Sequence, residues 1–187
     1  MLYKVLRNGS PCHGGIGRWY LPEGDQPGAW MPPIKDLILC ERGYHLCRPM
    51  DLVFWLDAEI YEAEARGELL EGADKIVVGQ ARLLRQLTTW TEETAKRFAY
   101  DCAERVYVLA AGVQPSTILA ASDGANAGVI ANHIAADAAW IIADAVCRGS
   151  ILERGEAWGR AWHVERSWQT ERLFAYLRGE VCGEEGA

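Results

Sequence analysis

Hydrophobic and polar positions alternate along the N-terminal half of the chain. Residues 60–65 (Ile-Tyr-Glu-Ala-Glu-Ala) alternate strictly, and residues 2–7 and 75–87 carry apolar side chains at a similar two-residue period. This period is typical of half-buried β-strands. We expect 60–65 and 75–87 to pair as an antiparallel hairpin around an acidic turn at residues 67–73.

The segment between the first strand and this hairpin is rich in glycine and proline. We expect a long ordered loop with short strands at residues 18–21 and 37–40, and a new element from Tyr44 to Cys47. Pro49 is suited to the first turn of a helix, where its missing N–H has no partner to lose, and predicts a short helix over residues 50–56.

After residue 88 the hydrophobic period becomes helical. Thr89-x-x-Glu92 has the pattern of a capping box, and the helical period after it predicts a capped first helix from Thr91 to about Gly112. Its apolar residues recur at 4-3-4-3 spacing and predict one buried stripe: Ala95, Ala99, Cys102, Val106 and Leu109. A second helix is expected over residues 126–148, stopping at Gly149, with one apolar side: Ile130, Ile134, Ile141 and Ala145.

A third helix is expected over residues 156–178, so the pattern indicates an α+β protein. We predict a small antiparallel β-rich module (1–88) packed on a C-terminal bundle of about three helices (89–181) and sharing one core with it. Residues 182–187 are expected to form a frayed tail.

The amino-acid composition narrows the classes of partner that the chain is expected to bind. Half of the 187 residues are hydrophobic, which excludes a disordered chain. The net charge of −7 argues against nucleic acid as a partner. Neither an export signal nor a membrane-spanning stretch is expected, because charged residues interrupt the apolar windows, so we predict a cytoplasmic protein. The six cysteines are too few for a disulfide scaffold and are expected to be reduced.

Several segments carry a family resemblance. They are Cys-Glu-Arg-Gly-Tyr-His-Leu-Cys at 40–47, His-Gly-Gly at 13–15, Ile-Tyr-Glu-Ala-Glu at 60–64, Asp-Lys-Ile-Val at 74–77 and Phe-Ala-Tyr-Asp-Cys-Ala-Glu-Arg at 98–105. Together they resemble uncharacterised proteins encoded by phages and actinobacterial prophages. Residues 98–105 are also similar to alanine-rich helical proteins catalogued as candidate immunity proteins. The resemblance implies a mobile genetic element and a bacterial cytoplasm, and it implies no reaction.

Cysteines and histidines near residue 45 raise the question of zinc. The candidate ligands are Cys40, His45, Cys47 and His13, with Cys12 in reserve. Zinc takes such thiolate and imidazole ligands, but Cys-x₄-His-x-Cys matches no standard zinc knuckle. The alternative is a pair of buried thiols and a histidine hydrogen-bonded to the backbone, so we do not favour a metal.

An enzymatic alternative uses the same region. The order of a first strand, Gly-Tyr-His, a short helix and a strand with Glu62 and Glu64 is similar to the arrangement of ADP-ribosyltransferases. The resemblance would make NAD the cofactor, with His45 holding the ribose and a glutamate activating the acceptor. Alternating glutamates also mark the solvent-exposed face of an ordinary strand, and fold analogy alone says little about function.

Aromatic residues favour a protein-binding function over an enzymatic one. Trp158, Trp162 and Trp168 crowd the third predicted helix and suggest a contact with a host protein or with a second copy of the chain. The polar stripe of the second helix has an ordinary interpretation as its solvent-exposed side, and it consists of His133, Asp137, Trp140 and Asp144.

Our leading hypothesis is therefore a non-enzymatic phage or prophage accessory protein that binds a host protein or a small ligand. We expect residues 40–48 to be the centre of any site, with ligand-binding side chains His13, Tyr44, His45 and Arg48. The structural alternative is a buried corner in which backbone satisfies His45 and Arg48 pairs with Glu41 or Asp51.

Overall fold

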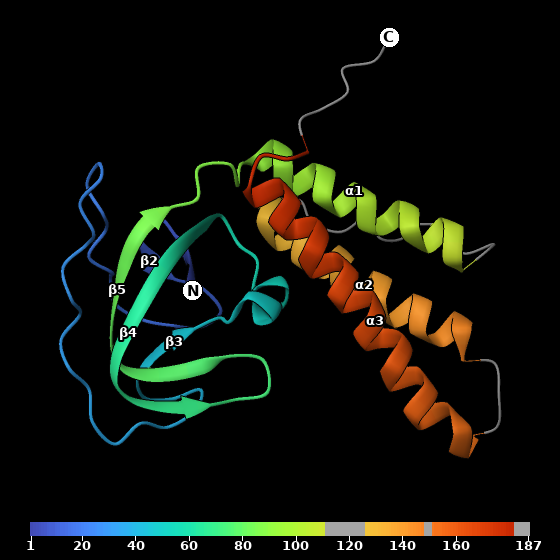
Figure 1. Cartoon of the computed structure of the whole chain (residues 1–187), viewed down its shortest axis with the longest axis horizontal. Coiled ribbons are helices and arrows are strands. Elements are labelled where there is room, and N and C mark those ends of the chain that lie inside the picture. Colours follow the sequence, from blue (N-terminus) through green and yellow to red (C-terminus); the bar gives the residue numbers. More distant parts are fainter. Residues whose placement is uncertain (111–125, 148–150, 182–187) are drawn as a thin grey trace, which may run out of the picture. The chain divides into compact units, whose positions relative to one another are not determined.

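The computed structural model describes residues 1–110, 126–147 and 151–181. The chain divides into two compact units, Met1–Thr91 and Glu92–Ala187. The first unit contains the strands and one short helix, and the second contains the long helices (Figure 1). The α+β class is confirmed. The expectation that both units share a core stays a prediction.

The first unit, called the β unit below, is built on a curled sheet. Its strands are β1 (Leu2–Arg7), β2 (Ser10–Pro11), β3 (Tyr44–Leu46), β4 (Glu59–Glu71) and β5 (Ile76–Gln86). They form one antiparallel sheet in the order β2-β1-β4-β5-β3. Beyond β3, Cys47 exchanges two backbone hydrogen bonds of 2.8 Å with Tyr3 of β1. The sheet therefore curls until the end of β3 meets β1.

The predicted hairpin of β4 and β5 is confirmed, but its turn is displaced. Residues 67–71 belong to β4 and do not form the expected acidic turn. The pairing register shifts between Arg66 and Leu69, where Gly67 has a φ of +85°. Such a bulge inserts extra residues into one strand without ending it. The turn lies instead just before β5, where the Gly72 N–H donates to the carbonyl of Lys75.

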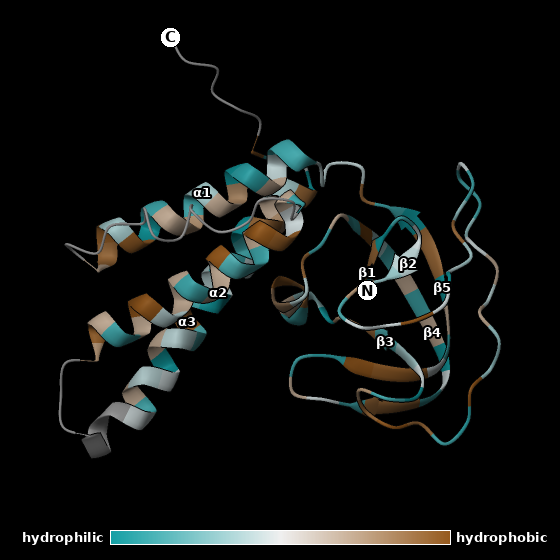
Figure 2. Cartoon of the chain, turned by 180° about the vertical axis from the view of Figure 1, so that it is seen from behind, coloured by the Kyte–Doolittle hydropathy of each residue, from teal (hydrophilic) through white to brown (hydrophobic). Residues whose placement is uncertain are grey.

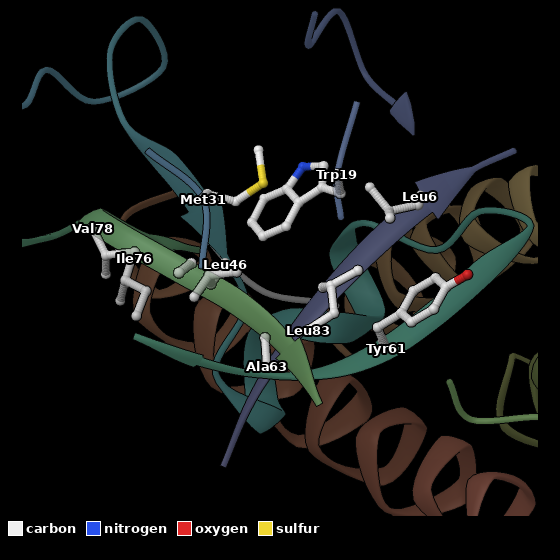
Figure 3. Close-up of a cluster of buried hydrophobic side chains, with 10 residues drawn as sticks. Leu6, Trp19, Met31, Leu46, Tyr61, Ala63, Ile76, Val78 and Leu83 are labelled. Atoms are coloured by element: carbon white, nitrogen blue, oxygen red, sulfur yellow. The ribbon is translucent and has the colours of Figure 1, made fainter. Parts of the chain in front are cut away.

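The inside of the curled sheet holds the hydrophobic core of the β unit (Figure 3). Its buried residues are Leu6, Trp19, Met31, Leu46, Tyr61, Ala63, Ile76, Val78, Ala81 and Leu83. Trp19 and Met31 come from the long loop between β2 and β3. The loop follows β5, because the Gly28 and Met31 N–H groups each donate at 2.9 Å to carbonyls of that strand. Sequence alternation located the strand residues but not these two loop residues.

The predictions of two short strands in this loop are wrong. At residues 18–21 the backbone is irregular, and Trp19 donates to the carbonyl of Gly9 at 3.1 Å. At residues 37–40 the chain makes a turn closed by an isolated bridge between Ile38 and Arg42. Asp36 and Cys40 have φ values of +54° and +65°, which an extended strand does not allow.

The predicted short helix is present as the 3₁₀-helix η1 (Pro49–Phe54). Pro49 occupies its first turn, as the sequence predicts. The helix ends two residues before the predicted limit, and Trp55 follows as its C-terminal cap. Its residues Leu52 and Val53 are fully buried.

The second unit, called the helical unit below, contains α1 (Glu92–Leu109), α2 (Ala127–Val146) and α3 (Ile151–Leu177). Helix α1 starts at Glu92, one residue after the predicted start at Thr91. Its predicted stripe is confirmed at four positions, since Ala95, Ala99, Cys102 and Val106 are all buried. Leu109 is 44% exposed, so its assignment to this stripe is wrong.

Helix α2 contacts both α1 and α3, and its buried face is mainly alanine. Asn126 caps it, since its side-chain oxygen accepts from the Val129 N–H at 3.0 Å. Ile134 is buried as predicted, but Ile130 and Ile141 are only half-buried. Ala145 is half-buried as well. Small side chains let neighbouring helices approach closely. Hydrophilic and hydrophobic residues both occur along each helix (Figure 2).

By length and composition, α2 is the one described helix that could cross a membrane. The core helix of a soluble protein meets the same criteria, so this is weak evidence and is compatible with a soluble protein. Helix α3 begins at Ile151, five residues before the predicted start. The predicted stops at Gly112 and Gly149 and the tail at 182–187 lie outside the described residues.

Candidate functional site

The helix η1 is fixed over the turn between β4 and β5 by the residues at its two ends. Arg48 donates through Nε to Asp51 Oδ2 at 2.6 Å, and through Nη2 to the carbonyl of Gly72 at 2.9 Å. Trp55 donates through its indole N–H to the carbonyl of Asp74 at 2.8 Å. This arrangement, called the η1 clamp below, holds the loop that carries residues 40–48.

Within the η1 clamp, Arg48 pairs with Asp51, which is the partner expected of a structural corner. The hydrogen bond that Arg48 donates to Asp51 raises the pKa of Arg48, so the guanidinium keeps its charge. Its Nη2 atom also contacts the carbonyl of Ala73 at 3.3 Å. The donors of Arg48 are thus turned toward the protein, and its ligand-binding role stays a prediction.

His45 lies half-buried on β3 and is held by backbone groups. Its Nε2 accepts a hydrogen bond from the Cys40 N–H at 3.0 Å, and its carbonyl accepts one from Lys4 Nζ at 3.1 Å. Burial lowers the pKa of His45, and the charges of Lys4 and Lys75 lower it further. The neutral imidazole is therefore the favoured form, as the hydrogen bond from Cys40 requires.

Tyr44 and Lys4 belong to an aromatic corner of the β-unit core. The Tyr44 hydroxyl donates to the carbonyl of Pro32 at 2.7 Å, and its ring meets Trp19 edge-on at 5.4 Å. The Lys4 ammonium lies 5.2 Å from the centre of the Trp19 ring, and burial lowers its pKa. Sequence reasoning missed Lys4, although it shares the alternation of Leu2 and faces the same side of β1.

The glutamates proposed for catalysis form ion pairs across the hairpin. Glu62 accepts two hydrogen bonds of 2.7 Å from Arg85, and Glu64 pairs with Arg82. In the sheet register His45 opposes Val77, and so the structure pairs the histidine with neither glutamate. The NAD-dependent role of these three residues stays a prediction.

The predicted zinc ligands are not brought together as one set. Cys40 is exposed, whereas Cys47 is buried and burial raises the pKa of its thiol to about 12. A different group forms instead, since ligand atoms of Cys12, His13 and Asp57 lie within 4.8 Å of one another. Sequence reasoning named the first two residues but missed Asp57, which strand pairing brings close from a distant part of the chain.

Asp57 is the buried centre of this group. Its side chain is 1% exposed and accepts from Arg7 at Oδ1 (2.9 Å) and Oδ2 (2.8 Å). Cys12 Sγ lies 3.5 Å from the carbonyl of Val5. Burial and then the Asp57 charge raise the pKa of Cys12 to about 11. The thiol is therefore protonated at neutral pH, which argues against a ready nucleophile.

A buried polar network in the helical unit has no counterpart in the sequence analysis. Gln169 and Glu165 are 0% and 1% exposed, and Arg166 is 5% exposed. Glu165 accepts from Arg105 of α1 at 2.6 Å, and Arg166 donates to Gln169 at 2.7 Å. Desolvation lowers the pKa of Arg166 to about 10. The network joins the helices and orders their packing.

Large aromatic side chains of the helical unit occupy both half-buried and exposed positions. Trp158 and Trp162 are half-buried and stacked, with ring centres 6.4 Å apart, and Arg105 covers Trp168. In contrast, Tyr100 and Tyr107 are 62% and 60% exposed.

The stripe predicted to be the solvent-exposed side of α2 is exposed at all its positions, which confirms that interpretation. It consists of His133, Asp137, Trp140 and Asp144.

Comparison of the chain with protein-family models, with curated proteins and with solved structures gives no match.

Proposed function

We propose that this chain is a phage or prophage accessory protein that acts in the bacterial cytoplasm by binding a host protein. The observation that supports the proposal is the outward face of α1, defined by Tyr100, Tyr107 and Val108. These side chains are 62%, 60% and 68% exposed. Tyrosine is enriched at binding hot spots because it buries a large rigid ring and offers a hydroxyl.

The geometry of α1 explains why this face is available to a partner. Tyr100 and Tyr107 are seven positions apart, close to two helical turns, and so lie on the same side. The opposite side of the helix packs within the helical unit through residues such as Phe98 and Cys102, both fully buried. The helix thus has one face committed to its own core and one aromatic face exposed.

The other binding hypotheses have weaker support. The half-buried stack of Trp158 and Trp162 leaves a second copy of the chain as an alternative partner. We favour the ADP-ribosyltransferase-like reaction less, because Glu62 and Glu64 form ion pairs with Arg85 and Arg82. We retain a small ligand of the β unit as a separate prediction.

The test compares the full chain with a Tyr100→Ser, Tyr107→Ser double variant in quantitative capture from lysate of a bacterial host. The control is Arg160→Ser, an exposed change on α3. We expect one host protein to bind the wild type and the control and to be lost from the double variant. That protein should then bind the purified chain in solution at a fixed ratio.

Circular dichroism must first show that the double variant is folded. Capture that is equal for all three chains would contradict the proposal. Light scattering identifies self-association, and a dimer abolished by the double variant would assign the α1 face to a second copy instead of a host protein.

A further inference from the structure

We propose that Cys12, His13 and Asp57 form a zinc-binding site in the β unit. Thiolate, imidazole and carboxylate are all established zinc ligands, and three protein ligands leave the fourth tetrahedral position to water. The site belongs to the β unit and the α1 face to the helical unit, so this proposal does not depend on the proposed protein partner.

The strands hold the three residues at one place. Leu6 of β1 opposes Pro11 on one side and Glu59 on the other. Cys12 directly follows Pro11, and Asp57 lies just before β4, so two chain-distant ligands flank the same strand. Their ligand atoms and that of His13 lie within 4.8 Å of one another. Ligand atoms around tetrahedral zinc are roughly 3.5 Å apart, so the three atoms must move closer by about 1 Å to hold the ion.

One ring nitrogen of His13 is hydrogen-bonded to the backbone, which leaves the other for a metal. Its Nε2 lies 3.2 Å from the carbonyl of Trp55, and its ring meets the Trp55 indole edge-on at 5.3 Å. A carbonyl only accepts, so this hydrogen bond places the proton on Nε2 and leaves the lone pair on Nδ1. Zinc-bound histidines commonly donate their other N–H to a backbone carbonyl in this way. The carbonyl of the clamp residue Trp55 therefore favours the tautomer in which Nδ1 keeps its lone pair for a metal.

Arg7 supplies the positive charge that balances Asp57 without a metal. Its guanidinium is bidentate on the carboxylate, and its side chain is 51% exposed whereas that of Asp57 is 1% exposed. Zinc and Arg7 thus compete for the same oxygens, and the guanidinium has solvent to move into. As the zinc–sulfur bond forms, the Cys12 thiol releases its proton to solvent. The thiolate and carboxylate then neutralise the two charges of the ion.

Cobalt(II) provides the test, because its thiolate complexes absorb in the near ultraviolet. Titration of the full chain is expected to give a thiolate band that saturates at one equivalent and is displaced by zinc. The band should disappear in Cys12→Ser, and His13→Ala should weaken cobalt binding by about tenfold or more. Cys40→Ser, which changes an exposed cysteine outside the set, should leave it intact.

A second variant tests the competition with Arg7. Arg7→Gln removes the resident cation, so zinc should bind more tightly and raise the melting temperature by more than it does in the wild type. Because His13 is exposed, His13→Ala is expected to fold. It therefore still tests the site if Arg7→Gln fails to fold. The proposal is overturned if the chain gives no thiolate band, or if the band survives Cys12→Ser.

Discussion

Gln169 of α3 donates a hydrogen bond from its side-chain amide to the main-chain carbonyl of Ala135 on α2, at 2.9 Å. The same amide nitrogen lies 3.3 Å from Glu165 Oε1, and its oxygen accepts from Arg166 at 2.7 Å. A fully buried amide with partners for both its ends thus joins two helices and contacts two buried charged residues, Glu165 and Arg166. Its contribution should appear directly in the stability of the helical unit.

We expect Gln169→Leu to lower the free energy of unfolding by about 1–3 kcal/mol, because buried partners lose a hydrogen bond that water cannot replace. Urea unfolding followed by far-ultraviolet circular dichroism measures the change. Glu171→Gln, on the exposed side of the same helix, serves as the control and should unfold like the wild type. An unchanged midpoint for Gln169→Leu would show that the network adds no stability.

The buried stripe of α1 gives a stronger prediction. Val106 is 0% exposed, so Val106→Asp places an unpaired carboxylate in an apolar environment and should unfold the helical unit. The neighbouring change Tyr107→Asp introduces the same charge at a 60% exposed position and should leave the fold intact. Thermal melting of both variants decides the point. A cooperative, wild-type-like transition for Val106→Asp would mean that the assigned face is wrong.

Periodicity predicted the elements well where one face of an element is buried. The spacing of Ala95, Ala99, Cys102 and Val106 located the core side of α1, and the alternation of residues 60–65 located a strand. Element ends were less predictable. Residues 67–71 looked like a turn because they are acidic and contain glycine, but a bulge at Gly67 lets the strand continue.

The candidate site was predictable only where its residues are neighbours in the chain. His13 and Cys12 are adjacent, and their residue types suggested ligation without a structure. Asp57 joins them through the pairing of β1 with β4, a contact that no local pattern encodes. The sequence left two roles open for Arg48, ligand binding or a pair with Glu41 or Asp51, and the structure shows its guanidinium bound to Asp51.

Gly43 provides a test of the turn before β3. Its φ is +123°, and a Cβ added there would lie 2.3 Å from Val77 Cγ1. Gly43→Ala therefore combines backbone strain with a steric clash and should lower stability by about 2 kcal/mol or more. Gly67→Ala is the matched control, since its φ is +85° and no atom lies within 4 Å of the added Cβ. It should cost only about 1 kcal/mol.

Denaturant midpoints for the two alanine variants separate the clash from the backbone strain. Equal losses would show that the neighbours of Gly43 yield easily and that the packing against Val77 is unimportant.

The last prediction concerns pH and His45. Burial, followed by the charges of Lys4 and Lys75, lowers its pKa in the folded protein below the ordinary value of 6.5. The unfolded chain therefore binds a proton at His45 at a higher pH than the folded chain does. Above the unfolded pKa both states are neutral and His45 adds no pH dependence. As the pH falls below about 6.5, protonation favours the unfolded state, and the loss grows until the folded pKa is reached.

The hydrogen bond from the Cys40 N–H to Nε2 gives this effect its structural basis, because an imidazolium has no lone pair to accept it. We expect His45→Gln to be less stable than the wild type at pH 8 and to lose less stability between pH 7 and pH 5. His163→Gln, an exposed change on α3, controls for the other histidines. Urea midpoints measured across this range give the comparison. If His45→Gln and the wild type lose stability in parallel as the pH falls, the environment of His45 does not keep it neutral. The structural account of residues 40–48 then fails.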